Sequence, residues 1–206
     1  MNPNVRRAND EVWSDRSHVR AVRDELRTGK PGSGALERLA KIADRYDVDA
    51  TGELNDQFFD DLLVRVDVVP ASLVLAQAAN ESAWGASRFA REGNNFFGIW
   101  CFKAGCGLKP QRREAGTKHE VKVFKTVKDG ITYYIHTINT GSAYLELRKL
   151  RAVYRQQHKK PTGFELAGGL TMYSQRGDAY VKEIRRMIRQ NQLAAYSIDR
   201  AMLERE

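Results

Sequence analysis

A single glutamate stands out because it lies near the end of an otherwise apolar segment. The segment from Ala71 to Trp84, ASLVLAQAANESAW, has few polar residues and predicts a buried central helix. In such a helix Gln77, Glu81 and Trp84 share one face, because they are spaced at i, i+4 and i+7. Partial removal from water beside an aromatic ring would favour the protonated carboxyl group. Glu81 is therefore a candidate general acid; the alternative is that it points into solvent.

The two cysteines also suggest local chemistry. Cys101 and Cys106 occur in the short segment CFKAGC. An even number of cysteines at this spacing favours a disulfide in an oxidising compartment, worth about 2 kcal/mol. Two reduced, packed thiols are the alternative. A four-ligand zinc site would need two more ligands, and only His119 is near in sequence, so we predict no metal site.

The beginning of the chain differs from the rest in composition. Residues 1–27 are charged with loosely helical apolar spacing, and residues 28–34, TGKPGSG, predict a flexible break. We therefore expect residues 1–34 to form a helical arm and linker rather than core. The main domain is expected at 35–195, followed by a tail at 196–206.

The elements that would position Glu81 follow from apolar periodicity. Segment 93–107 is rich in Gly, Asn and aromatic residues and predicts a structured loop. In segment 111–124 the side chains alternate between two faces, with Gly116 between the two halves, which predicts a small β-hairpin. The fold class predicted is mainly α (α+β), with the inserted hairpin lobe facing a helical lobe across a substrate cleft. A second apolar segment runs from Phe58 to Val66. Helices are predicted around 36–46, 71–84, 131–138, 144–158, 161–170 and 181–188.

Length and charge limit the classes of partner. The chain has 206 residues, 42% of them hydrophobic, which suits one compact domain. A formal net charge of +8 favours polyanions without choosing among them. The basic residues are mixed with acidic ones and no DNA-binding motif appears, so we expect no nucleic-acid partner. The basic run 148–160 is interpreted as a solvated helix face, or secondarily as attraction to an anionic wall.

The sequence offers no membrane-spanning segment. No apolar run approaches the roughly 20 residues that cross a bilayer. The first ten residues are polar and lack the apolar centre of a signal peptide, which taken literally predicts a cytosolic chain. A trimmed or misplaced start would look the same, so this observation carries little weight.

Several segments together resemble one enzyme family. The stretch LVLAQAANESAWGASRFAREGNNFFGIWCF, at 73–102, resembles the signature of the glucosaminidases of glycoside hydrolase family 73, most closely the Bax-type group of the lysozyme-like superfamily. CFKAGC resembles the two-cysteine loop of that group. FKTVKDGITYYIHTINTGSAY and GLTMYSQRGDAYVKEIRRMIRQNQL resemble its following helix and its C-terminal segment. The resemblance spans about 36–193.

This resemblance implies a function. The family members are endo-acting β-N-acetylglucosaminidases, which would cleave β-1,4 linkages after N-acetylglucosamine in bacterial peptidoglycan. An N-acetylmuramidase acting on the same strand and a catalytically weak peptidoglycan-binding module are the alternatives. We expect a monomer in the periplasm or cell envelope, with no cofactor, because hydrolysis needs positioned oxygen groups and water.

The resemblance also assigns candidate catalytic residues. Glu81 matches the general acid, and Tyr180 matches a tyrosine at the catalytic centre, with an ordinary core tyrosine as the alternative. Glu114 and Glu120, one on each predicted strand, are candidates for a second carboxylate that activates water. Either could instead be an ordinary surface glutamate. Without such a base, the N-acetyl group of the substrate could act as the nucleophile.

The remaining candidates are substrate contacts. Asn94 and Asn95 could fix a loop and also donate to sugar groups. Trp100, or Trp84, could stack on a sugar ring, or Trp100 could instead seal the lobe. Tyr173 and Ser174 match a family loop facing the cleft, with a simple turn as the alternative. Gln77 joins this group because it shares the face of Glu81.

Overall fold

The computed structural model describes residues 1–110 and 119–197. They form a mainly helical fold with one small antiparallel sheet, so the predicted fold class is confirmed. Within these residues, no helix combines the length and the apolar character that a membrane span requires. The α-helices are α1 (Asn2–Thr28), α2 (Ser33–Arg45), α3 (Asp56–Arg65), α4 (Ala71–Glu81), α5 (Arg88–Gly93), α6 (Val127–Thr140), α7 (Leu145–Gln156), α8 (Gly163–Leu166) and α9 (Asp178–Gln190). The 3-10 helices are η1 (Ser142–Tyr144), η2 (Ala167–Leu170) and η3 (Leu193–Ser197). The strands are β1 (Trp100–Cys101), β2 (Gly107–Leu108) and β3 (Glu120–Lys122).

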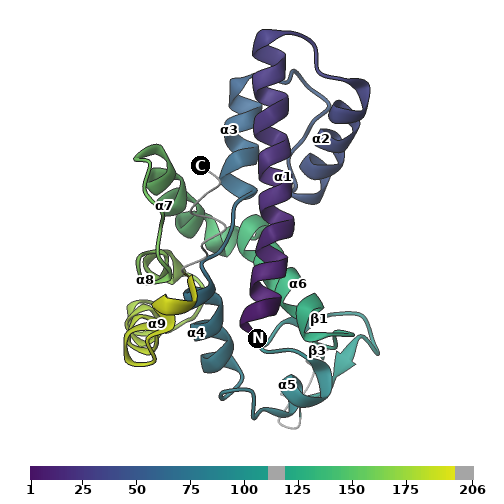
Figure 1. The fold of residues 1–206 in the computed structure, drawn as a ribbon. Coiled ribbons are helices and arrows are strands. Elements are labelled where there is room, and N and C mark those ends of the chain that lie inside the picture. The colour runs from purple at the N-terminus through teal and green to yellow at the C-terminus, as the bar shows by residue number, and fades with distance from the viewer. Residues whose placement is uncertain (111–118, 198–206) are drawn as a thin grey trace.

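Helix α4 is surrounded by other helices. Helices α1, α8, α9 and η3 pack against it (Figure 1). This burial explains its sequence, because a helix covered on most sides must be apolar on most sides. The buried residues are Ala71, Ser72, Leu73, Val74, Ala76, Gln77 and Ala78.

Helix α4 ends earlier than its apolar pattern predicts. The Ser82 hydroxyl donates to the Ala78 carbonyl at 2.6 Å, and Ala83 and Trp84 adopt left-handed backbone angles, with φ of 49° and 59°. These residues turn the chain away from the helix axis. The predicted extension to Trp84 is therefore wrong, and Glu81 occupies the last helical position.

Helix α1 belongs to the core. It packs against α2, α3, α4 and α6 and crosses the front of the molecule in Figure 1. The expectation that residues 1–34 form an arm outside the core is therefore wrong for this helix. The division at residues 35 and 195 stays a prediction. The apolar side chains of α1 in the core cluster are Val5, Ala8, Val12, Val19 and Val22.

The connection between α3 and α4 is held by buried charges. Arg16 from α1 and Arg151 from α7 donate to backbone carbonyls within residues 63–68, at 2.6 to 3.4 Å. Asp67 accepts two hydrogen bonds from Arg155, at 3.1 and 3.0 Å. Burial alone would raise the pKa of Asp67, but Arg16, Arg151 and Arg155 outweigh it and hold that pKa below its ordinary value.

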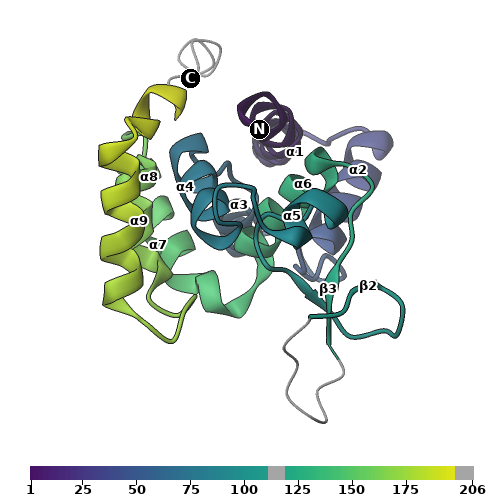
Figure 2. The same ribbon diagram turned by 90° about the horizontal axis from the view of Figure 1, so that it is seen from below.

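The three strands form a sheet in the order β1–β3–β2. Val121 of the central strand pairs with Trp100 on one side and with Leu108 on the other, both antiparallel. The sheet lies at the edge of the molecule, on the side away from α9 (Figure 2). A strand within 119–124 is present as predicted, but its partners come from 100–108, which we expected to be a loop. The other half of the predicted hairpin falls mainly at 111–118, outside the described residues.

Two features fix the close spacing within this sheet. Cys101 in β1 and Cys106 next to β2 form a disulfide, with their Cα atoms 6.2 Å apart. Gly107 permits β2 to approach β3, because a Cβ atom there would lie 2.0 Å from the Val121 carbonyl oxygen. The small lobe therefore depends on a covalent bridge as well as on its few backbone hydrogen bonds.

We predict that Asp67→Asn lowers the free energy of unfolding by about 3–5 kcal/mol, because it leaves buried guanidinium groups without a countercharge. The stabilisation by the ionised carboxylate is present above the unfolded pKa of about 3.9 and is lost as the pH falls through the lower folded pKa. Urea unfolding between pH 2 and pH 7 measures both effects. Asp44→Asn, an exposed position, is the control. If Asp67→Asn lowered the free energy of unfolding no more than Asp44→Asn does, the role assigned to this cluster would be refuted.

We predict that replacing both cysteines by serine lowers the free energy of unfolding by about 2 kcal/mol, through the lost constraint on the unfolded chain. A thiol reductant should destabilise the native chain by a similar amount and leave the Cys101→Ser, Cys106→Ser variant unaffected. Urea titrations with and without reductant measure this. An unchanged unfolding midpoint of the reduced native chain would contradict it.

Candidate active site

Glu81 lies at the C-terminal end of α4 and is partly exposed. Its Oε1 atom accepts a hydrogen bond from the Tyr180 hydroxyl at 2.8 Å and one from Asn80 Nδ2 at 3.2 Å. Tyr180 comes from α9, 99 residues further along the chain. The structure thus brings together the two residues that the family resemblance assigns to the catalytic centre. Both hydrogen bonds fall on Oε1 rather than on the other oxygen of the carboxyl group.

A chain of hydrogen bonds leads to Glu81 from the interior. The Tyr134 hydroxyl on α6 donates to Gln77 Oε1. Gln77 Nε2 donates to the Tyr180 oxygen at 3.0 Å, and Tyr180 in turn donates to Glu81. Buried polar groups in such a chain polarise one another and hold a single arrangement. We call Tyr134, Gln77, Tyr180 and Glu81 the α4 relay.

Gln77 has a different place from the one predicted. It is fully buried, with 0% of its surface exposed, and both ends of its amide are used within the α4 relay. The prediction that Gln77 contacts substrate is therefore corrected, because no sugar can reach it. It positions the phenol that contacts Glu81.

Further tyrosines enclose the α4 relay. Tyr173 stacks on Tyr180 with ring centroids 5.0 Å apart, and Tyr144 lies 5.9 Å from Tyr173. Burial, then Tyr173 and Glu81, raise the pKa of Tyr180 far above its ordinary value. Burial and the charge of Glu81 likewise raise the pKa of Tyr173 and of Tyr144. These phenols therefore keep their protons, and Tyr180 remains a donor toward Glu81 at any physiological pH.

Tyr134 and Tyr144 are residues that the sequence did not single out for function. Tyr134 falls in the apolar stripe of α6, which predicts a core residue. Its ring is indeed part of the core and stacks on Phe97, with ring centroids 3.8 Å apart. No local sequence signal distinguishes a core tyrosine whose hydroxyl joins a hydrogen-bond chain from one that only fills the core. A search for buried tyrosines facing the apolar helix that carries Glu81 could have suggested it.

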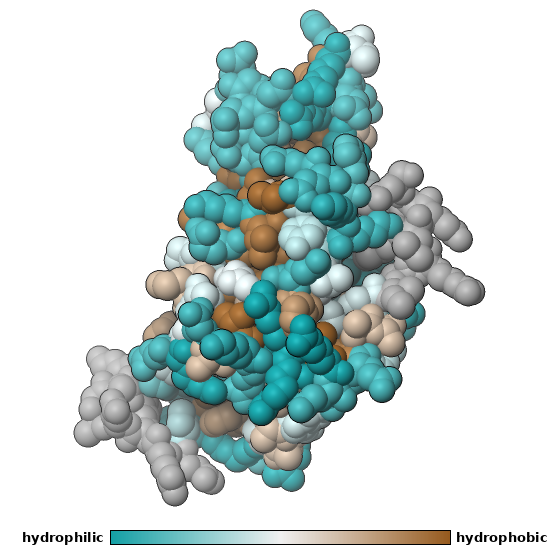
Figure 3. All heavy atoms as spheres, turned by 90° about the vertical axis from the view of Figure 1, so that its left-hand side faces the viewer, coloured by the Kyte–Doolittle hydropathy of each residue, from teal (hydrophilic) through white to brown (hydrophobic). Residues whose placement is uncertain are grey.

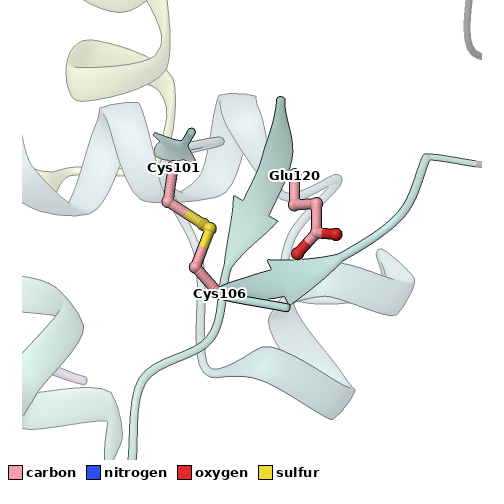
Figure 4. Close-up of side chains that lie close together, drawn as sticks. All are labelled: Cys101, Cys106 and Glu120. Atoms are coloured by element: carbon pink, nitrogen blue, oxygen red, sulfur yellow. A yellow bond between two sulfur atoms is a disulfide. The ribbon is translucent and has the colours of Figure 1, made fainter. Parts of the chain in front are cut away.

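Glu120 is engaged in fixing the β lobe. It is buried, and its two oxygens accept from the backbone N–H groups of Gly105 and Gly107, at 3.3 and 2.9 Å. Figure 4 shows it close to the disulfide, and one of its oxygens and the two sulfurs lie within 4.8 Å of one another. Because the sulfurs are bonded to each other, they are not available to a metal ion. Glu114, the other candidate second carboxylate, lies outside the described residues.

The two candidate tryptophans, Trp84 and Trp100, are exposed but occupy different surfaces. Trp100 in β1 is 54% exposed and stacks on His119 with ring centroids 4.0 Å apart. Trp84 is 65% exposed and lines a groove with Leu75 and Tyr196, a groove that does not include Glu81. The prediction that Trp84 continues the face of Glu81 is therefore corrected, because the helix ends before it.

The asparagines hold the loop after α5. Asn95 is buried, donates to the carbonyls of Ile99 and Lys122 at 2.9 and 2.8 Å, and accepts from two backbone N–H groups. Its amide is therefore fully used, which corrects its predicted role as a substrate contact. Asn94 caps α5 in the left-handed conformation and donates to the Phe124 carbonyl at 3.0 Å. The Ser174 hydroxyl accepts from Arg176 N at 3.3 Å, as in a turn.

Two comparisons with known proteins gave matches. Residues 57–193 match the glucosaminidase family model, described as mannosyl-glycoprotein endo-beta-N-acetylglucosaminidase. The chain is 36% identical over 155 residues to the protein bax of Escherichia coli K12; this match covers 75% of the chain and 55% of that protein. The chain thus corresponds to about half the length of this relative. No solved structure gives a significant match. The family match takes in α4, the β lobe and α9, and the chain belongs to the glucosaminidase family.

Proposed function

We propose that this chain hydrolyses the β-1,4 linkages after N-acetylglucosamine in bacterial peptidoglycan, with Glu81 as the general acid. The observation that carries the proposal is the partly exposed Glu81 carboxyl group, bonded at 2.8 Å to a phenol that stays protonated. Membership of the glucosaminidase family supports the class of bond, and the similarity to bax supports the Bax-type group. The disulfide supports an oxidising compartment, which we propose to be the periplasm or cell envelope.

The proposed reaction begins with proton transfer from Glu81 to the leaving glycosidic oxygen. Tyr180 and Asn80 occupy Oε1, so the transferred proton leaves from the opposite oxygen of the carboxyl group. The carboxylate that remains keeps the hydrogen bond from Tyr180, which lowers the energy of the charge formed in this step. The glycan strand would lie between the helices around Glu81 and the β lobe, with Trp100 as a stacking surface.

The hydrogen bonds of Glu120 bear on which group attacks the anomeric carbon. Both oxygens of Glu120 accept backbone hydrogen bonds, which argues against its acting as a base on water. We propose that the N-acetyl group of the substrate attacks instead, so that the product keeps the anomeric configuration of the substrate. Inversion would point to a separate base, for which Glu114 remains a candidate.

We predict that Glu81→Gln lowers the rate of peptidoglycan digestion by about 10²–10⁴-fold, because glutamine cannot give up a proton. Reducing-end labelling of the products identifies the cleaved bond, and nuclear magnetic resonance of fresh products gives the anomer. Glu92→Gln, at an exposed position on α5, is the matched control and should digest at the native rate. Digestion by Glu81→Gln at the rate of the control would remove Glu81 from the mechanism.

We predict that Tyr180→Phe and Tyr134→Phe each lower kcat more than they change KM, because the α4 relay orients Glu81 rather than binding the sugar. Tyr134→Phe should also lower the free energy of unfolding by about 1–3 kcal/mol, since the buried Gln77 oxygen loses its donor. Steady-state kinetics on a soluble glycan fragment and urea unfolding measure the two effects.

The neighbouring residue offers a matched control for this experiment. Tyr133 is 39% exposed and holds Lys122 over its ring at 4.1 Å, a contact that Tyr133→Phe retains. Tyr133→Phe should therefore match the native chain in both kcat and stability. If Tyr134→Phe also matched it, the hydrogen bond from Tyr134 would have no part in holding Glu81.

A further inference from the structure

The outer face of α9 carries four cations that play no part in the proposed reaction. Lys182, Arg185, Arg186 and Arg189 are spaced at i, i+3, i+4 and i+7, so they lie on one side of the helix. We call these four residues the α9 patch. Together with Phe164 and Gln190 they line a shallow hollow of about 480 Å³. Figure 3 faces this side of the molecule, and strongly hydrophilic side chains gather in its lower half, where α9 lies.

Two of the three arginines of the α9 patch lie over an aromatic ring. The guanidinium groups of Arg185 and Arg189 lie over the Phe164 ring, 5.0 and 4.3 Å from its centroid. Arg185 Nε also donates to the Phe164 carbonyl at 3.0 Å. A planar group fixed in this way loses less conformational freedom when it binds a carboxylate, and it can offer two donors at once.

Among the residues that the structure describes, the nearby glutamates are engaged with partners other than the cations of the α9 patch. Glu183 on the same helix pairs with Arg176 at 2.6 Å. Glu165 on α8 caps its own helix and accepts from Thr162 N at 2.7 Å. In the part of the chain that the structure describes, no carboxylate lines the hollow and no ion pair involves the four cations.

We infer that the α9 patch binds the carboxylate groups of the short peptides that substitute peptidoglycan strands. This inference rests on the proposed function, because that function supplies a polymer with closely spaced carboxylates. The same helix supplies Tyr180 to Glu81, so the α9 patch and the proposed acid are fixed relative to each other. About nine residues separate Tyr180 from Arg189, or roughly 13 Å along the helix. Peptides near the bond to be cleaved, or on an adjacent strand, are the groups that this surface would hold.

The test compares binding to insoluble peptidoglycan in the Glu81→Gln background, in which the wall is bound without being digested. The patch variant carries Lys182→Gln, Arg186→Gln and Arg189→Gln; Arg185 stays because it bonds to the backbone of α8. The control variant carries Arg7→Gln, Arg20→Gln and Lys30→Gln. These three exposed cations lie on or next to α1, so the control loses the same charge. Co-sedimentation at low and high salt gives the affinities, and thermal unfolding checks the fold.

We expect the patch variant to bind about tenfold more weakly than its parent at low salt, and the control variant to bind about as well as its parent. High salt should remove most of the difference between the patch variant and its parent. Peptidoglycan stripped of its peptides should bind the patch variant and its parent equally. Should the triple variant unfold, Lys182→Gln with Arg186→Gln, both exposed, takes its place.

Three results would overturn the inference. The control variant could lose as much affinity as the patch variant, which would mean that only net charge matters. The patch variant could lose equal affinity for peptide-free glycan. It could also keep its affinity for the wall while losing binding to phosphatidylglycerol vesicles, which would make the partner a lipid surface. A failure of the proposed function would appear instead as unimpaired digestion by Glu81→Gln.

Discussion

The hydrogen-bond chain from Tyr134 through Gln77 and Tyr180 to Glu81 is the constraint on which the site depends. Each donor faces one acceptor, so the chain has a single direction and ends on the carboxylate. It joins α6, α4 and α9, three helices that are distant in sequence. A fully satisfied buried network of this kind specifies one arrangement, because leaving any member unpaired costs free energy. The same network that fixes the core therefore fixes the Glu81 carboxyl group, which we propose as the acid.

The position of α4 itself depends on the buried charges before it. The last turn of α3 and the connection to α4 place several backbone carbonyls away from water, and Arg16 from α1 and Arg151 from α7 satisfy them. Asp67 balances this charge within the same cluster. Buried ion pairs add little net stability over apolar packing, but they tolerate few alternative geometries. The cluster thus fixes where α4 begins, as the relay fixes where it ends.

The β lobe is stabilised by other means, because three very short strands cannot form a core. The disulfide ties its outer strands. Glu120 accepts from the N–H of Gly105, in the turn between the cysteines, and from the N–H of Gly107, at the start of β2. Asn95 then joins the loop after α5 to β3. These contacts hold the lobe that carries the exposed Trp100, the side chain that we propose stacks on a sugar ring.

Apolar periodicity in the sequence predicted most of the helices and the burial of α4, because it records which face of an element meets the core. Alternation predicted a strand in the second half of 111–124, where β3 lies. Residue pattern and spacing pointed to Glu81 and the cysteine pair, and the family resemblance pointed to Tyr180. Tertiary structure alone decided the place of α1 in the core, the strand partners of β3, the end of α4 before Trp84 and the burial of Gln77. These features rest on contacts such as Tyr134 with Gln77 and Gln77 with Tyr180, which join residues 57 and 103 positions apart. Periodicity describes one element at a time, so it cannot tell a tyrosine that only fills the core from one whose hydroxyl completes a site built by three helices.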